Sequence, residues 1–138
     1  MTTDTNDFNG KIIAEFREKA GKLGGMFEGA PMLLLHTTGA TSGAERINPL
    51  MFRPEGDAWV VFASKGGAPS SPDWYHNLRA NHDLSIEVGA ETVKVRARVA
   101  EGAEHDRIWA AQKAAVPQFA EYETKTTRKI PVVVLERR

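Results

Sequence analysis

Two short loops of this chain carry the residue types best suited to binding an anion. Residues 37–43 (TTGATSG) and residues 64–67 (SKGG) each follow an apolar, strand-like run. Glycine lets the backbone approach a ligand closely, and the free N–H groups and hydroxyls of such loops are hydrogen-bond donors. Arg46 and Lys65 add cations, which strengthen hydrogen bonds to phosphate or carboxylate oxygens. Together the loops predict a binding site for a phosphate-bearing ligand.

Other kinds of chemistry receive little support from residue types and spacing. Neither loop matches a Walker phosphate loop or the dinucleotide fingerprint of a βαβ unit, which disfavours nucleotide hydrolysis and a Rossmann-type nicotinamide site. No serine lies in the pattern of a nucleophile elbow, and no pair of carboxylates lies within an apolar run. The histidines are dispersed, so no metal site is expected; they are His36, His76, His82 and His105. The chemistry is therefore expected to come from a bound organic cofactor.

The composition indicates one domain, residues 1–138, without net charge. Eighteen basic and eighteen acidic residues cancel, so no overall field attracts nucleic acid, and an anion site has to be local. The absence of cysteine excludes disulfides and thiol catalysis. Residues 1–10 are polar, and no apolar run reaches the roughly 20 residues of a membrane-spanning helix. We expect a cytoplasmic protein with no signal peptide and no nucleic-acid partner.

Residues 1–25 form an N-terminal region in which residues 8–23 show the pattern of an amphipathic helix. Apolar residues recur at three- and four-residue spacing with charged residues between them, and two glycines follow. We expect the apolar face to pack on the rest of the domain. A partner protein or peripheral contact with a membrane surface are the alternatives, and a homodimer is left open by the sequence.

The middle of the chain reads as strands followed by a short helix. Apolar runs predict strands over residues 32–36, 46–53 and 58–63, the second and third joined as a hairpin by a Pro-Glu-Gly-Asp turn. Ser71 is expected to cap a helix of about two turns that runs to residue 80.

The last part of the chain continues this mixture of strands and helices. Strict alternation over residues 84–88 and 93–99 predicts a second hairpin with one buried and one solvated face. A helix over residues 104–116, a second helical piece behind Pro117 and a strand over residues 130–135 complete the chain. About six mostly antiparallel strands with an N-terminal helix and short peripheral helices predict a mainly β (α+β) fold with a barrel-like sheet.

Six segments of the chain, in matching order and spacing, resemble one family. They are residues 33–39 (LLLHTTG) with Ser42, Gly43 and Arg46; residues 48–50 (NPL); residues 63–67 (ASKGG); Pro72 with Trp74 and Tyr75; Asn77, Leu78 and Asn81; and residues 130–134 (IPVVV). From Pro31 to the C-terminus the chain is similar to the deazaflavin-dependent nitroreductase family. The resemblance implies a split β-barrel that binds coenzyme F-420, an 8-hydroxy-5-deazaflavin found mainly in actinobacteria. It also implies that the reduced coenzyme serves as a hydride donor.

The resemblance assigns roles to individual positions. The phosphate and acidic tail of the coenzyme would contact Ser42, Gly43, Arg46 and Lys65. The deazaflavin ring would lie along Pro49, Leu50, Met51, Ala63 and Ser64. Further cofactor contacts are expected at Thr38, Gly66, Gly67, Trp74 and Asn77, and substrate contacts at Met51, Phe119 and Tyr122.

The expected activity is that of an oxidoreductase that transfers hydride from reduced F-420 to quinones, enones or nitroaromatics. The hydroxyl or N–H of Ser64 would stabilise negative charge on the acceptor, and Tyr122 or solvent would supply a proton. Two alternatives stay open: a non-catalytic carrier of deazaflavin or flavin, and an oxidoreductase that uses flavin mononucleotide on the same fold.

Overall fold

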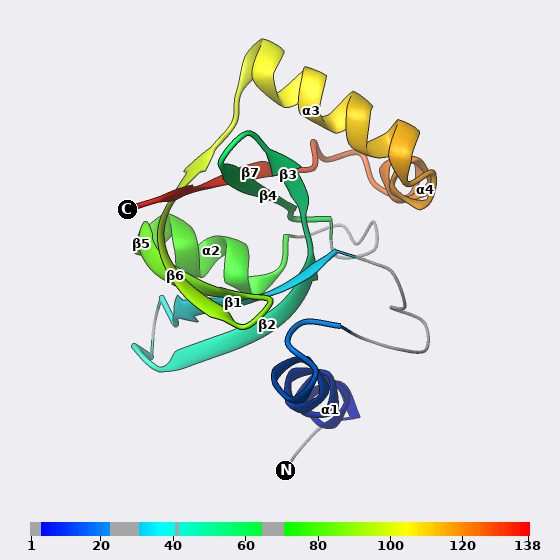
Figure 1. The fold of residues 1–138 in the computed structure, drawn as a ribbon. Helices are drawn as coiled ribbons and strands as arrows, with labels where there is room; N and C mark the ends of the chain where they lie inside the picture. The colour runs from blue at the N-terminus through cyan, green and yellow to red at the C-terminus, as the bar shows by residue number, and fades with distance from the viewer. Residues whose placement is uncertain (1–3, 23–30, 41, 65–70) are drawn as a thin grey trace.

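The computed structural model describes residues 4–22, 31–40, 42–64 and 71–138, and side chains from residue 10 onward. At its centre is a seven-stranded antiparallel sheet in the order β2-β1-β5-β6-β7-β4-β3 (Figure 1). The strands are β1 (Met32–Thr38), β2 (Glu45–Met51), β3 (Arg53–Glu55), β4 (Ala58–Phe62), β5 (Asp83–Val88), β6 (Glu91–Val99) and β7 (Val132–Arg137). The helices are α1 (Asp4–Glu18), α2 (Asp73–Ala80), α3 (Gly102–Ala115) and α4 (Gln118–Thr124). The mainly β (α+β) fold predicted from the sequence is confirmed, with seven strands instead of about six.

The sheet curls because its two edge strands are consecutive in the chain. β2 ends at Met51 and β3 begins at Arg53, so only Phe52 separates the two edges. The two Cα–Cα steps from Met51 to Arg53 span at most about 7 Å, and the edges must therefore lie next to each other at this point. Viewed along its axis, the sheet forms a ring (Figure 1). The N–H of Phe52 donates to the carbonyl of Pro31 at 2.9 Å, which holds the corner against the start of β1.

The expected hairpin between residues 46–53 and 58–63 is wrong in part, because the chain changes its pairing partner at this corner. The two runs do not form one hairpin: β2 pairs with β1 from Met51 back to Glu45, and only the three residues of β3 pair with β4. Residues 46–53 read as one strand-like run without a turn signal at Phe52. A change of hydrogen-bonding partner in the middle of such a run leaves no local trace in the sequence.

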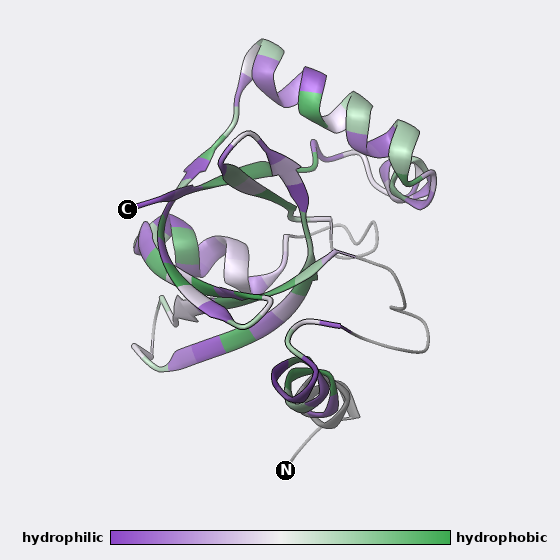
Figure 2. Ribbon diagram, viewed as in Figure 1, coloured by the Kyte–Doolittle hydropathy of each residue, from purple (hydrophilic) through white to green (hydrophobic). Residues whose placement is uncertain are grey.

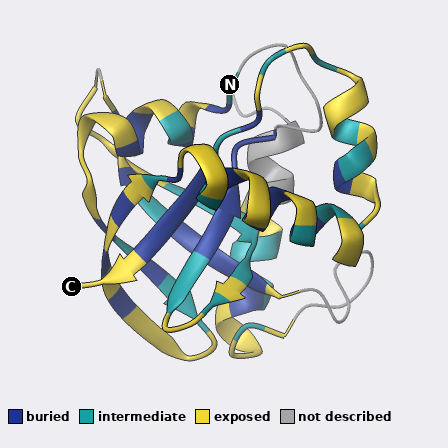
Figure 3. Ribbon diagram, turned by 90° about the horizontal axis from the view of Figure 1, so that it is seen from above, coloured by how far each residue is buried: buried dark blue, intermediate teal, exposed yellow. Residues whose placement is uncertain are grey.

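Alternation along the strands sorts the apolar side chains onto an inner and an outer face. Leu33 and Leu35 of β1 belong to the inner cluster, which Trp74 and Leu78 of α2 close at one end. Leu34 lies on the outer face, where it packs with Phe16 of α1. Figure 2 shows the apolar residues along the strands, and Figure 3 shows that the buried residues concentrate there.

The first helix packs on the barrel, as expected. Beside Phe16, the half-buried Ile12 and Ile13 contact this outer cluster. Arg17 adds a bidentate ion pair with Glu87 of β5, at 2.8 and 3.0 Å. His36 of β1 contacts the same carboxylate at 2.5 Å. None of the described helices is long and apolar enough to cross a membrane.

Helices α3 and α4 cover a separate part of the outer face. Phe62 of β4 packs against Trp109 of α3 and Phe119 of α4, with ring centroids 5.7 and 5.6 Å apart. At the start of α2 the structure differs from the expectation, because the N-cap residue is Pro72 and no side chain caps the helix. The Ser71 hydroxyl instead accepts a hydrogen bond from Arg128.

Candidate functional site

The loop between β1 and β2 is a tight turn stabilised by its own backbone. The N–H of Gly39 donates to the carbonyl of Ala44 at 2.7 Å, and the N–H of Gly43 to the carbonyl of Gly39 at 2.9 Å. The Ser42 hydroxyl accepts from the N–H of Ala44 at 3.2 Å. Gly43 has a φ of +73°, and the space where a Cβ would lie contains no described atom within 4 Å. A ligand can therefore approach the backbone closely at Gly43.

Asn77 connects this loop to α2. Its Oδ1 accepts from the N–H of Ala40 at 2.9 Å, and its Nδ2 donates to the Thr37 hydroxyl at 3.3 Å. Asn77 was expected to contact the cofactor, yet its side chain is buried and its amide holds the loop in place. Trp74, another expected cofactor contact, lies in the inner core. Both residues are therefore placed to support the predicted site from beneath it.

Arg46 lies at the start of β2 and is exposed. Its backbone faces Thr37 across the ladder, so both residues belong to the face on which α2 lies. Arg46 forms no ion pair with a described residue, whereas Arg17, Arg96, Arg98 and Arg107 each face a carboxylate. Thr38 and Ser42, which carry hydroxyl groups, are exposed and lie close to Arg46 in the sequence. This end of β2 therefore presents an unneutralised cation beside the turn.

The second predicted loop begins where β4 leaves the sheet. Ala63 is fully buried and Ser64 is 8% exposed. The Ser64 hydroxyl forms no hydrogen bond with a described residue, while its carbonyl accepts from Arg128 at 2.8 Å. Lys65, Gly66 and Gly67 lie outside the described residues. A hydroxyl without a hydrogen-bond partner among the described residues is available to bind a ligand.

Helix α2 follows the second loop in the chain and binds the first loop. It begins at Asp73, shortly after the second loop, and Asn77 one turn later binds the first loop. Four helical residues correspond to about 6 Å along the axis. The structure thus brings the turn at residues 39–44 and the start of α2 to the same end of the barrel.

The positions predicted to line the deazaflavin ring lie on both faces of the sheet. Leu50 packs against the inner cluster, as does its neighbour in register, Leu33. Met51 lies on the outer face, between the cluster under α1 and the cluster under α3 and α4. The side-chain amide of the buried Gln112 approaches the sulfur of Met51 at 4.0 Å. Pro49 is half-buried and pairs with the outward-facing Leu34.

The predicted substrate residues form part of an aromatic cluster. Phe119 is 7% exposed, and its ring lies 6.1 Å from Trp109 and 5.3 Å from Tyr122. Tyr122 is half-buried, and its hydroxyl has no hydrogen-bond partner among the described residues. The indole N–H of Trp109 donates to Glu123 at 2.5 Å, and this bond, with Lys113 beside it, lowers the pKa of that carboxyl. Phe119 is thus a core residue that supports Tyr122 from behind.

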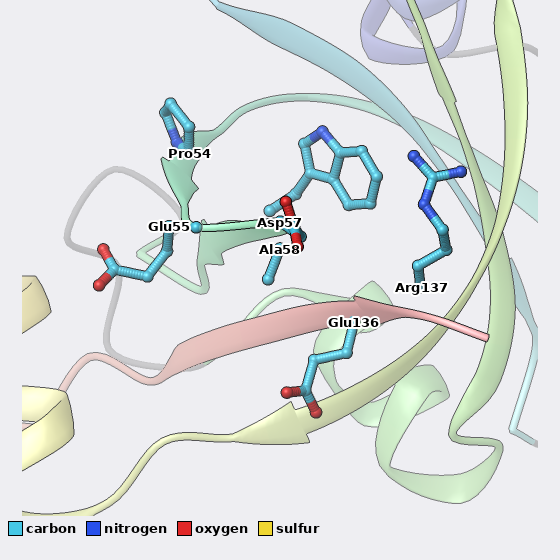
Figure 4. A pocket seen from close by; sticks show the side chains of 8 residues that line it. Pro54, Glu55, Asp57, Ala58, Glu136 and Arg137 are labelled. Carbon is cyan, nitrogen blue, oxygen red and sulfur yellow. The ribbon is translucent and has the colours of Figure 1, made fainter.

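A surface hollow at the β3–β4 turn and the end of β7 includes none of the predicted site residues (Figure 4). The carboxylates of Glu55, Asp57 and Glu136 line it, and the guanidinium of Arg137 lies 5.3 Å from the Trp59 ring. Three carboxylates disfavour an anionic ligand in this hollow.

Comparison with known proteins decides between the candidate families. Residues 11–137 match the family of F420H(2)-dependent quinone reductases. The chain belongs to this family. An F420H(2)-dependent quinone reductase of Mycobacterium tuberculosis is 43% identical over 129 residues, which are 91% of this chain and 87% of the relative. Membership makes the chain an F-420-dependent reductase with coenzyme F-420 as its cofactor, as the sequence resemblance implied.

Two solved structures share the fold. An F420-H2 dependent reductase (FDR-A) is 43% identical, with a TM-score of 0.70 over 77% of this chain and 94% of its own. A structure described as a domain-swapped dimer is 36% identical, with a TM-score of 0.72 over 96% of this chain and 100% of its own. The split-barrel architecture expected from the sequence is thereby confirmed.

The residues at the β1–β2 end of the barrel fit an anionic coenzyme tail. The exposed guanidinium of Arg46 and the hydroxyl of Ser42 are donors of the right kind, and the space beside Gly43 lets a ligand approach the backbone. Sequence reasoning missed Arg128 and Gln112. Neither carries a sequence signal, since Arg128 stands in a polar linker and Gln112 in an ordinary helix, and their roles arise from contacts distant in the chain.

Proposed function

We propose that this chain oxidises reduced coenzyme F-420 and transfers its hydride to a quinone, and that electron-poor enones and nitroaromatics are further acceptors. The observation that carries this proposal is Ser64, a residue only 8% exposed whose hydroxyl has no hydrogen-bond partner among the described residues, at the strand end predicted to meet the deazaflavin ring. Bound reduced F-420 would supply a hydride, and the quinone takes up the hydride and one proton to become a hydroquinone.

Arg46, Ser42 and Gly43 would hold the phosphate and acidic tail, with Lys65, Gly66, Gly67 and Thr38 as further contacts. Exposure of the Arg46 guanidinium and its lack of a carboxylate partner among the described residues support this role. The deazaflavin ring would be positioned by the side chains or the backbone of Pro49, Leu50, Met51 and Ala63. Asn77 and Trp74 would act indirectly, by fixing the turn and α2.

Ser64 and Tyr122 would act on the acceptor. Hydride addition to a quinone leaves negative charge on a carbonyl oxygen, and a hydroxyl aimed at this oxygen stabilises that charge. Tyr122 would supply the proton, and its hydroxyl is free of described partners. Met51 and Tyr122, with Phe119 behind, would form the wall against which the acceptor lies, because all three contact the outer cluster of α3 and α4.

A homodimer is proposed as well. Its support is the solved relative described as a domain-swapped dimer, which this chain matches over 96% of its length. Sedimentation equilibrium of the purified protein tests it: a mass near twice 15.2 kDa is expected, and a mass near 15.2 kDa at all concentrations contradicts it.

Equilibrium titration tests the choice of cofactor. Oxidised F-420 and flavin mononucleotide are titrated separately into the protein, with bound ligand followed by fluorescence. F-420 is expected to bind at least about tenfold more tightly, a difference of about 1.4 kcal/mol, because it carries an acidic tail beyond its phosphate. Equal or reversed preference would favour the flavin-dependent alternative.

A further inference from the structure

Arg128 joins three parts of the chain that are distant in sequence. It lies in the linker between α4 and β7. One terminal nitrogen of its guanidinium donates to the carbonyl of Ala63 at 3.0 Å and to the hydroxyl of Ser71 at 3.3 Å. The other donates to the carbonyl of Ser64 at 2.8 Å. The end of β4 and the start of α2 are therefore fixed by a single side chain.

The partners that the structure describes for Arg128 are neutral oxygens. A guanidinium is a rigid, planar fork, so N–H bonds from its two terminal nitrogens to consecutive carbonyls restrict the direction of the peptide between them. That peptide belongs to Ser64, whose hydroxyl is the proposed donor to the acceptor. The guanidinium is partly withdrawn from water, and this burial lowers the pKa of Arg128.

We propose that Arg128 is a positioning residue of the reductase: it fixes the backbone of Ala63 and Ser64 so that the Ser64 hydroxyl is held where the acceptor is reduced. The inference rests on the proposed function and adds a residue that acts through Ser64. The acceptors on Ala63, Ser64 and Ser71 require the fork of arginine; lysine retains the charge but not this geometry.

The competing explanation is that Arg128 only fastens the α4–β7 linker to the barrel. The chain contains a matched control for this explanation. Arg138 also donates to two backbone carbonyls, those of Val95 at 2.9 Å and Leu84 at 3.1 Å. These acceptors lie on β6 and β5, so Arg138 does not bind the backbone of Ala63 or Ser64. Arg138→Met therefore removes a comparable set of bonds elsewhere on the same barrel.

The experiment compares Arg128→Met, Arg128→Lys and Arg138→Met with the unaltered protein. Thermal unfolding, the Kd for oxidised F-420 and the kcat for oxidation of reduced F-420 by 2-methyl-1,4-naphthoquinone are measured for each. Both methionine variants are expected to show similar decreases in Tm. Only the two Arg128 variants should lose kcat, by about tenfold, because loss of one aligned donor bond has an effect of that order.

A double variant shows whether Arg128 acts through Ser64. If it does, Arg128→Met added to Ser64→Ala lowers kcat by less than twofold further, because residues that share one function are not additive. Unchanged kcat in Arg128→Met, full activity in Arg128→Lys, or fully additive losses in the double variant would each overturn the inference. Failure of the unaltered protein to turn over would instead overturn the proposed function on which it rests.

Discussion

At the scale of single residues, the Ser64 hydroxyl is proposed to stabilise the negative charge that forms on the acceptor. Ser64→Ala is expected to lower kcat for quinone reduction about tenfold, the effect of losing one hydrogen bond of about 1.4 kcal/mol, while the Kd for F-420 changes little. Steady-state kinetics with a naphthoquinone measure the first quantity, and fluorescence titration measures the second.

Ser85→Ala is the matched control, because Ser85 is a half-buried serine on β5. Its kinetics should equal those of the unaltered protein. A Ser64→Ala variant with full kcat would show that another group, or solvent, stabilises the charge on the acceptor.

Arg46, at the start of β2, has no carboxylate partner among the described residues, and this leads to a prediction about binding. Arg46→Ala should weaken F-420 binding by about 1.5–3 kcal/mol, the range for hydrogen bonds to charged groups, with a smaller loss at high salt because the site is exposed. Arg96→Ala is the control, since Arg96 is also exposed and is already paired with Asp83. Equal affinity of the Arg46→Ala and unaltered proteins at low salt would remove Arg46 from the cofactor site.

At the scale of helices, Phe119 is the buried residue of α4. Phe119 packs between Phe62, Trp109 and Tyr122. Phe119→Ala should therefore lower the free energy of unfolding by about 3–5 kcal/mol, as is typical for buried phenylalanine. Urea denaturation measures this loss. Tyr122→Phe, which keeps the ring, should retain most of the stability, and a Phe119→Ala loss below about 1 kcal/mol would show that α4 is held by other contacts.

The ion pair between helix α1 and the barrel should contribute less to stability at acidic pH. The hydrogen bonds from Arg17 lower the pKa of Glu87 below its usual range, so the carboxylate contributes stability above its unfolded pKa of about 4.3. This contribution is lost as the pH falls through the lower, folded pKa. Glu87→Gln should thus destabilise the protein near neutral pH, and the difference should shrink between about pH 5 and pH 3.

Urea denaturation of both proteins across this pH range measures the effect. Glu91→Gln is a suitable control, because Glu91 is exposed and forms no ion pair with a described residue. A difference between the Glu87→Gln and unaltered proteins that grows toward pH 3 would contradict the expected role of the ion pair.

At the scale of the whole molecule, the individual elements could be predicted more fully than their pairing. The alternation of residues 84–88 and 93–99 identified the β5–β6 hairpin because its contacts are local. The switch at Phe52 could not be found, since it depends on β1 and β4, which are far away in sequence. Closure of the barrel is a consequence of that switch.

The same distinction applies to the site. Glycine, hydroxyl and cation spacing in residues 37–46 predicted an anion-binding turn, because these properties belong to the segment itself. That Asn77 contacts the cofactor stays a prediction, and the hydrogen bonds of its amide with Ala40 and Thr37 could not be predicted from the sequence. Arg128 gave no signal at all, because its partners Ala63, Ser64 and Ser71 are more than fifty residues away. Supporting residues become recognisable only when the fold brings them together.

Turnover of reduced F-420 is the most direct test of the account. Purified protein is mixed anaerobically with reduced F-420 and 2-methyl-1,4-naphthoquinone, and oxidised F-420 and hydroquinone are quantified against reactions without protein. The account predicts protein-dependent formation of both products in equal amounts, with little turnover when reduced flavin mononucleotide replaces F-420. Tight binding of F-420 without turnover would identify a carrier, and turnover with the flavin alone would identify a flavin-dependent enzyme; either result would contradict the account.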